Sequence, residues 1–364
     1  MSGPGPAAPG GVGFAIAGCG EIALRNARAL AASGAGTLRW AIDPNRSLAE
    51  DLARRHGARA GETLSQALED PAVHVVLIAS PHDLHAALAL EALHAGRHAI
   101  VEKPLARTAE EARRMIAAAR ERRVSVAAFY ALRHYPETMA ARALFAEGTL
   151  GELHSGSISE HFSKEMPYWF GGSSGRSRSS WRAWRERSGG GVLIMNLCHH
   201  IDRLLDLTGR RVERVSCETA RRAVPGDVED VAAMVLRLEG GAIVAVDAST
   251  SAPGGGDSRL ALRAEHGQIA LDPPPRFLAL RRNPHGATNR WCALPTGDEV
   301  SARGAFIRAF VSEASQPPPG LPQGLADALH VQEILDAAYA SAESGRPVDL
   351  PAREDSGART PARA

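Results

Sequence analysis

The segment VGFAIAGCGEIA, residues 12–23, decides the fold class of this chain. It begins as an uninterrupted apolar run, typical of a buried strand, and continues as G-x-G-x-x-A into a helical pattern. Gly18 permits the tight turn, Gly20 lets the backbone approach a pyrophosphate, and the helix N-terminus attracts the anion. The segment therefore predicts a dinucleotide-binding turn. Its candidate cofactor-binding residues are Gly18, Cys19, Gly20, Glu21 and Ile22.

An acidic residue follows the next predicted strand, residues 37–42. Asp43 lies 25 residues after Gly18, where a carboxylate accepts hydrogen bonds from the adenosine ribose and repels a 2′-phosphate. This favours NAD as the cofactor. Arg46, three residues later, can pair with a phosphate, so it keeps NADP open as the alternative. Asp43 also suits a second role, as the cap of the helix that begins near Asn45.

Further apolar runs alternate with helical patterns up to residue 132. This alternation predicts a parallel, doubly wound Rossmann sheet. In such a sheet, ligands bind at the carboxyl ends of the strands. Lys103 directly follows the predicted strand 99–101, so we expect its side chain to reach a bound substrate. The other strands of this series are predicted at 73–79 and 125–128, and its helices at 86–95 and 109–122.

Three short motifs distinguish the same region. They are S-P-x-x-x-H at 80–85, A-G-R-H at 95–98 and E-K-P at 102–104. Together they resemble the nucleotide-binding domain of the Gfo/Idh/MocA oxidoreductase family, which includes glucose–fructose oxidoreductase and inositol dehydrogenase. The resemblance implies that Lys103 lies at the nicotinamide and the substrate. It also implies that the cofactor is lined by Ser80, Pro81, His85 and Glu102.

An unusual segment, residues 164–187, holds three of the five tryptophans together with five arginines. Aromatic faces beside cationic donors suit sugar rings, carboxylates and phosphates. Single-stranded nucleic acid binds to the same residue types, but a nucleotide-binding fold and a net charge of +1 argue against it. Trp181 and Arg182 match a W-R pair of the family, which makes both candidates for substrate binding. An oligomer surface is the alternative for Trp169 and Trp184.

The second family motif is GGGVLIMNLCHHID, residues 189–202, which resembles the family's glycine-led entry into an active-site helix. The resemblance makes His199 the acid/base candidate. Many polyol dehydrogenases of the family carry an aspartate four residues earlier, where this chain has Met195 and then Asn196. A methionine cannot raise the basicity of a histidine, so we expect Asn196 to orient His199 or to bind substrate. His200, on the same helical face, is a candidate for substrate binding.

Arg133 lies at the expected boundary between two domains. It belongs to an R-x-x-P stretch that the family also has, which implies a substrate-side position, and an interdomain ion pair is the alternative. Short alternating runs between 212 and 280 then predict a largely antiparallel open sheet, with helices at 304–314 and 325–344. The expected division is a flexible tail at 1–11, a Rossmann domain at 12–132, a substrate-binding and oligomerisation domain at 133–350, and a flexible tail at 351–364.

Composition narrows the remaining choices. The four cysteines lie far apart and form no C-x-x-C pair, which indicates reduced thiols in a cytoplasmic protein and no metal site. No apolar run approaches the length of a membrane span, and the start lacks the basic and apolar regions of a signal peptide. The near-neutral charge argues against nucleic acid and membrane partners. The family resemblance implies a homodimer or homotetramer formed through the C-terminal sheet.

These observations predict an NAD-dependent dehydrogenase or reductase that acts on a CH–OH group of a sugar, polyol or related small molecule. His199 takes the hydroxyl proton and Lys103 stabilises the developing alkoxide, or the two exchange roles. In one alternative, bound NAD is only transiently reduced and the protein is a lyase, epimerase or glycosidase. In another, it is a non-catalytic NAD(P)-binding regulator, which only the missing aspartate at Met195 supports.

Overall fold

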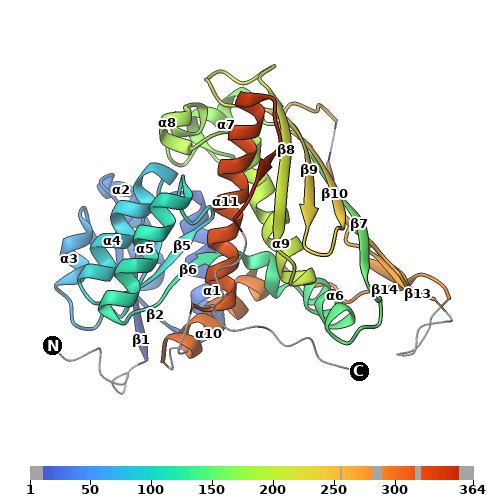
Figure 1. The fold of residues 1–364 in the computed structure, drawn as a ribbon. Coiled ribbons are helices and arrows are strands. Elements are labelled where there is room, and N and C mark those ends of the chain that lie inside the picture. The colour runs from blue at the N-terminus through green and yellow to red at the C-terminus, as the bar shows by residue number, and fades with distance from the viewer. Residues whose placement is uncertain (1–10, 255, 281–288, 316–320, 352–364) are drawn as a thin grey trace.

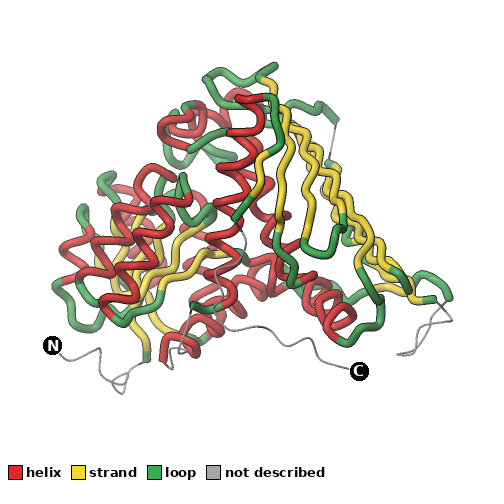
Figure 2. The backbone as a smooth tube through the Cα atoms, in the orientation of Figure 1, coloured by secondary structure: helices red, strands yellow, loops and turns green. Residues whose placement is uncertain are grey.

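The computed structural model describes residues 11–254, 256–280, 289–315 and 321–351, which form two sheets with helices between them (Figure 1). The long helix α11, Gln323–Ser344, runs between the sheets, and Figure 2 shows their strands on opposite sides of it. Neither α11 nor any other helix of the described ranges is long and apolar enough to cross a membrane. The segments expected to be flexible tails, 1–11 and 351–364, lie almost wholly outside the described residues.

The first half of the chain folds into the predicted Rossmann sheet. Its six strands run in the order β3-β2-β1-β4-β5-β6 within the described residues, and every neighbouring pair is parallel. Phe14 and Ile16 of β1 belong to one core cluster, and Ala15 and Ala17 belong to the other. This burial on both faces explains the uninterrupted apolar run in the sequence. The strands are β1 (Val12–Ala17), β2 (Gly36–Ile42), β3 (Arg59–Gly61), β4 (Val75–Ile78), β5 (His98–Glu102) and β6 (Val126–Phe129), and the helices are α1 (Glu21–Ser33), α2 (Arg46–His56), α3 (Leu64–Leu68), α4 (His85–His94) and α5 (Ala109–Arg122).

The second half forms a mostly antiparallel sheet, as the sequence predicts. Its nine strands among the described residues run β14-β13-β12-β11-β7-β10-β9-β8-β15, and one pair, β7 with β10, is parallel. Buried and exposed residues alternate along β9, and the buried face belongs to the same core cluster as α9 and α11, of which α11 packs against β8. The opposite face stays open to solvent. The strands are β7 (Leu153–His161), β8 (Val212–Ala220), β9 (Val231–Leu238), β10 (Ile243–Ser249), β11 (Asp257–Ala264), β12 (Gly267–Ala270), β13 (Arg276–Ala279), β14 (Cys292–Ala293) and β15 (Val348–Asp349), and the helices before the last one are α6 (Pro136–Ala146), α7 (Met166–Gly171), α8 (Arg185–Ser188), α9 (Cys198–Thr208) and α10 (Glu299–Ser315).

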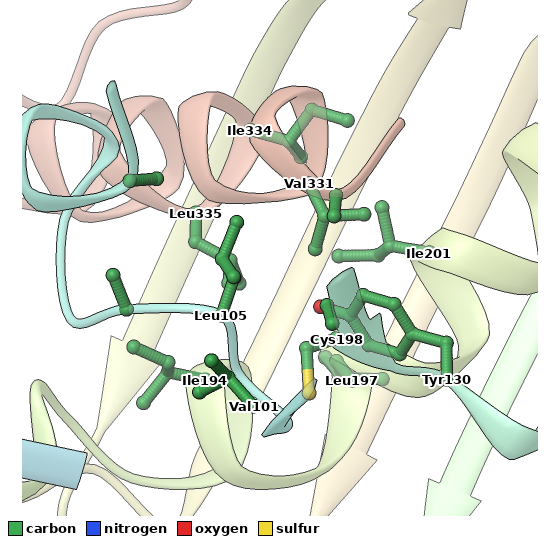
Figure 3. Packing of buried hydrophobic residues seen from close by; sticks show 14 of the residues in the cluster. Val101, Leu105, Tyr130, Ile194, Leu197, Cys198, Ile201, Val331, Ile334 and Leu335 are labelled. Atoms are coloured by element: carbon green, nitrogen blue, oxygen red, sulfur yellow. The ribbon is translucent and has the colours of Figure 1, made fainter. Parts of the chain in front are cut away.

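Helix α11 joins the cores of the two halves. It packs against α5 and β6 on one side and against α9 and β8 on the other. Figure 3 shows Leu335 of α11 beside Leu105, which follows β5, and Val331 beside Ile201 of α9. One continuous apolar core therefore connects the end of β5 to the helix motif of the second half, the segment 189–202 that leads into α9.

Helix α10 crosses back onto the Rossmann half. Its Phe306, Ile307 and Phe310 belong to the same core cluster as Phe14 of β1. The ring of Phe306 also stacks on that of Phe129, at the end of β6, with 4.4 Å between the ring centroids. A helix from the far end of the chain therefore completes the core of the first half.

Arg133 lies in the contact between the halves, and all three nitrogens of its guanidinium are engaged by carboxylates. It donates to both oxygens of Asp202 on α9, at 2.9 and 2.6 Å, to Asp327 on α11 at 3.0 Å, and to Asp206 at 3.4 Å. The side chains of Arg133 and Asp202 are 11% and 0% exposed. The structure thus favours the interdomain ion pair over the substrate-side position that was expected for Arg133.

We expect Arg133→Met to lower the free energy of unfolding by about 3–5 kcal/mol, because the buried carboxylate of Asp202 would lose both donors. Urea unfolding followed by circular dichroism measures the change. Arg142→Met is the matched control, since Arg142 also pairs with Asp206, at 2.9 Å, but is 43% exposed. The control should cost less than about 1 kcal/mol. Equal losses in the two variants would contradict the role assigned to Arg133.

Candidate active site

The glycine turn between β1 and α1 has the geometry that its sequence motif requires. Gly18 has a φ of +92°, and a Cβ there would lie 2.7 Å from main-chain atoms of Ala79 and Ser80. The turn therefore lies directly against the segment that follows β4, and only glycine fits at this position. The candidates Gly18, Ser80 and Pro81 therefore meet at the ends of two adjacent strands. Cys19 is buried, and burial raises the pKa of its thiol to about 12, which makes it a core group.

Helix α1 begins without a capping side chain, because its N-cap is Gly20. The N–H groups of its first turn and the positive end of its dipole are therefore available to an anion. A Cβ on Gly20 would meet only Ser177, at 3.9 Å, so a ligand can approach the backbone closely. Glu21 accepts a hydrogen bond from the N–H of Ser174 at 3.2 Å, and Ile22 packs against the core. These features fit the pyrophosphate of a dinucleotide.

Asp43 ties the glycine turn to the end of β2. Its Oδ2 accepts from the N–H of Cys19 and its Oδ1 from the N–H of Asn45, both at 2.8 Å. The cap of α2 is Asn45, whose side chain accepts from the N–H of Ser47, so the capping role considered for Asp43 belongs to its neighbour. Arg46 is 75% exposed and forms an ion pair along its own helix. Asp43 therefore lies beside the glycine turn, whereas the Arg46 guanidinium pairs with another side chain of α2.

His85 connects two segments that carry candidate residues. Its ring is buried, with Nδ1 2.9 Å from the carbonyl oxygen of Pro104 and Nε2 3.1 Å from that of Ser80. Burial lowers the pKa of His85, so the ring is neutral and donates to one of the two carbonyls at a time. His85 thereby holds the E-K-P turn against the segment after β4.

The tryptophan-rich segment packs onto the same region through His82. The buried ring of His82 lies against Trp181, with 4.4 Å between the ring centroids. Arg182 lies over the ring of Trp181, 4.6 Å from its centroid. Trp169 is buried within the chain, which excludes the oligomer surface considered for it, whereas Trp184 is 44% exposed. Trp181 and Arg182 are thus brought to the strand ends that carry the cofactor candidates.

Glu102 lies in a buried polar network at the end of β5. Its Oε1 accepts from Asn26 of α1 at 2.9 Å and from Arg303 of α10 at 2.8 Å. Arg303 also donates to the side-chain oxygen of Asn26 at 2.6 Å. The carboxylate expected to line the cofactor is therefore engaged by two helices, which fixes the strand end at which Lys103 follows.

Lys103 reaches the helix motif of the second half. Its Nζ donates to the main-chain oxygen of Met195 at 2.8 Å. Met195 lies in a π-helical turn, Leu193–Leu197, that leads into α9. Such a turn interrupts the regular hydrogen-bond ladder of the helix and makes carbonyl groups available to other donors. A neutral carbonyl, that of Met195, therefore faces the lysine.

His199 lies half-buried at the start of α9, with its ring edge-on to that of Tyr130 and 6.3 Å between the centroids. Its Nδ1 is buried and has no hydrogen-bond partner in the part of the chain that the structure describes. Burial first, and then the charge of Lys103, lower the pKa of His199 well below its ordinary value. The imidazole is therefore neutral, which a proton acceptor must be, although burial and Lys103 both oppose its protonation.

The other two candidates of the helix motif have different surroundings. Asn196 is half-buried in the π-helical turn, next to the carbonyl that Lys103 binds. His200 is buried, and its Nε2 lies 2.9 Å from a carboxylate oxygen of Glu160 on β7. The structure thus gathers Lys103, Asn196 and His199 at one place and directs His200 toward the second sheet.

Two groups at this site lack a signal in the sequence. The carbonyl of Met195 is available because of a π-helical turn, which no residue pattern reveals. His82 lies at the site because its ring contacts that of Trp181, a residue distant in the sequence. Such a contact can be recognised only in the folded structure. Within the described ranges, no three His, Cys, Asp or Glu side chains are grouped as a metal site.

Comparison with protein families agrees with this geometry. Residues 12–130 match the model described as "Oxidoreductase family, NAD-binding Rossmann fold", and residues 138–270 match the GFO/IDH/MocA C-terminal domain. The two matches cover the Rossmann sheet, strands β7 to β12 of the second sheet and the helix motif with His199. The boundary between them falls close to Arg133, which links the two halves.

Named relatives and solved structures of similar fold include dehydrogenases and an NAD complex. The levoglucosan dehydrogenase of Pseudarthrobacter phenanthrenivorans is 30% identical over 58% of this chain, a match that spans 58% of that protein. The scyllo-inositol 2-dehydrogenase (NADP(+)) of Bacillus subtilis is 25% identical over 79% of this chain and 82% of its own length. The crystal structure of GenD2 from gentamicin A biosynthesis, in complex with NAD, has a TM-score of 0.79 at 27% identity and covers 97% of this chain and 99% of its own. The chain belongs to the Gfo/Idh/MocA family of NAD-binding oxidoreductases.

Proposed function

We propose that this protein catalyses NAD-dependent hydride transfer at a CH–OH carbon of a sugar, a polyol or a related small molecule. The observation that carries the proposal is the hydrogen bond from Lys103 to the main-chain oxygen of Met195, which holds an ammonium group near the neutral imidazole of His199. The named relatives are dehydrogenases of levoglucosan and scyllo-inositol. Both are polyhydroxylated molecules, which supports the proposed substrate class.

The rarity of lysine in this chain supports a chemical role for Lys103. The sequence has only two lysines, Lys103 and Lys164, against 40 arginines. A guanidinium stays charged throughout the physiological pH range, whereas an ammonium can release its proton when its surroundings favour the neutral form. Position 103 therefore holds a basic side chain of the kind that can exchange a proton.

Bound NAD supplies the hydride acceptor for oxidation, and NADH supplies the donor for reduction. In the oxidation direction, His199 takes the proton of the substrate hydroxyl, because its ring is neutral and the residue is only half-buried. Lys103 donates a hydrogen bond to the same oxygen and stabilises the negative charge that develops on it. Asn196, beside the lysine, orients the substrate or the imidazole.

The cofactor assignment rests on Asp43 and Arg46. Each oxygen of Asp43 accepts one main-chain N–H and retains a further lone pair for a ribose hydroxyl. Arg46, which was the reason to consider NADP, is exposed and bonded to Glu50. These contacts favour NAD. One relative is named as an NADP(+) enzyme, so cofactor screens need both dinucleotides.

We also propose a homodimer or homotetramer that forms through the open face of the second sheet, in the reducing environment of a cytoplasm. Val235 of β9 and Ile243 of β10 are 48% and 43% exposed on neighbouring strands. Apolar side chains gathered on one face favour a protein partner. The described cysteines are all free thiols, which suits a reducing compartment.

Lys103→Met should lower kcat by at least about 100-fold while leaving the dissociation constant of NADH within about twofold. A cofactor-reduction screen against polyols, aldoses and sugar nucleotides supplies the substrate for this measurement. Lys164→Met is the matched control, because Lys164 lies over the rings of Phe162 and Tyr168, and it should retain activity. Normal turnover of the Lys103 variant would overturn the proposed mechanism.

The pH dependence of kcat/KM for oxidation should report His199. The base must be neutral, so activity is retained above its pKa and lost as the pH falls through that value. Because this pKa is lowered from 6.5, we expect the acid limb below pH 6.5. Asn196→Asp adds a negative charge nearby, which favours the imidazolium and should move the limb upward by roughly one pH unit. An unmoved limb would exclude His199 as the titrating base.

Sedimentation velocity tests the proposed assembly. The unmodified protein should sediment as a dimer or a tetramer, and the double variant Val235→Glu, Ile243→Glu should sediment as a smaller species, because burying a carboxylate in an apolar contact is costly. Circular dichroism and NADH binding control for an intact fold. A wild-type monomer at micromolar concentration would refute the proposal.

A further inference from the structure

A segment of the second half lies directly on the glycine turn. The N–H of Ser174 donates to a carboxylate oxygen of Glu21, at the start of α1, over 3.2 Å. Ser177 is the only side chain that a Cβ on Gly20 would meet. The segment is closed at its base by a hydrogen bond from the N–H of Ser179 to the carbonyl of Phe170, at 2.9 Å. Residues 171–179 therefore border the site that the geometry fits to a pyrophosphate.

Arg176 extends from this segment into the glycine turn. Its Nε donates to the carbonyl oxygen of Cys19 at 3.1 Å, and its Nη1 donates to Asp51 of α2 at 2.8 Å. Its Nη2 is buried and has no partner in the described ranges of the chain. The side chain is 15% exposed. A largely buried guanidinium with an unused donor thus lies at the main chain of a dinucleotide-binding turn.

In the described part of the chain, Arg176 has one charged partner, Asp51, and an unused donor. Asp51 is shared by three guanidinium groups, because Arg54 and Arg55 also bond to it, at 2.7 and 3.0 Å. The hydrogen bonds from Arg55 and then Arg176 lower the pKa of Asp51, so the carboxylate is charged. It still leaves the Nη2 of Arg176 without a partner among the described residues. The uncapped N-terminus of α1 adds its dipole to the same region. Leaving a buried charged donor unsatisfied is costly, and a phosphate oxygen would satisfy it.

We propose that Arg176 binds a phosphate group of the dinucleotide, so that the second half of the chain completes the phosphate site of the first. This inference rests on the proposed function, which supplies the dinucleotide. The pyrophosphate, common to NAD and NADP, is one source of the phosphate. The 2′-phosphate of NADP is the other, since the N–H of Cys19 is held by Asp43, the candidate ribose ligand. Asp51 competes with either phosphate for the same guanidinium.

The test compares dissociation constants of NADH and NADPH, measured by fluorescence titration, for the wild type, Arg176→Met and Arg178→Met. Arg178 is an exposed arginine of the same segment and serves as the matched control. Arg176→Met should weaken binding about 10- to 100-fold, because a charge-assisted hydrogen bond is lost. The Arg178 variant should change it by less than about twofold. Weaker binding of both dinucleotides identifies the pyrophosphate, and weaker binding of NADPH alone identifies the 2′-phosphate.

Unchanged binding of both dinucleotides by Arg176→Met would overturn the inference. A wild-type protein that binds neither would instead overturn the proposed function, so the two failures are distinguishable. If Arg176→Met does not fold, Asp51→Asn provides the test. It removes the carboxylate that competes with a phosphate for Arg176, and it should tighten dinucleotide binding by about threefold or more. Binding by Asp51→Asn that is unchanged or weaker would count against the inference.

Discussion

The hydrogen bond from Lys103 to the main-chain oxygen of Met195 joins the two halves of the chain at the site, and the remaining contacts there hold its two ends in place. On the sheet side, Glu102 is fixed between Asn26 and Arg303, so the strand end cannot shift without breaking a buried ionic network. On the helix side, a π-helical turn presents the carbonyl. Because this acceptor is neutral, it leaves the charge of Lys103 uncancelled. That charge would stabilise an alkoxide, and, after burial, it also contributes to the lowered pKa of His199, so the lysine keeps the imidazole neutral but opposes its protonation.

The parts of this fold that could be predicted from sequence are those encoded by local patterns. β1 is buried on both faces, so its sequence is an apolar run. That run and the glycines after it predict a parallel strand and a dinucleotide-binding turn. β3, at Arg59–Gly61, is too short to produce a pattern and was not predicted. The parallel pairing of β7 with β10 depends on which distant strands meet, and alternation within each strand carries no information about its neighbour.

The site shows the same division. Lys103 and His199 belong to motifs that a sequence can display, but the partners of a side chain are a matter of packing. Arg133 illustrates this limit, because its R-x-x-P context suited either a substrate or an ion pair. In the structure, Arg133 forms ion pairs with Asp202 and Asp327, which lie on helices far apart in the sequence. The sequence around Arg133 does not reveal these partners. Similarly, Met195 contacts Lys103 through its main-chain oxygen, and the identity of its side chain gives no sign of this contact.

The boundary proposed between residues 132 and 133 separates the two sheets but not their cores. Phe306, Ile307 and Phe310 of α10 belong to a core cluster of the Rossmann half, and α11 packs against both halves. Taken alone, residues 12–132 would expose the apolar surface that α10 covers, which is unfavourable by roughly 25 cal/mol for each Å². The first half thus depends on the end of the chain for its core and on Arg303 to neutralise Glu102. It follows that the glycine turn and the helix that carries His199 are parts of one folded unit, in which the position of Lys103 is set by both.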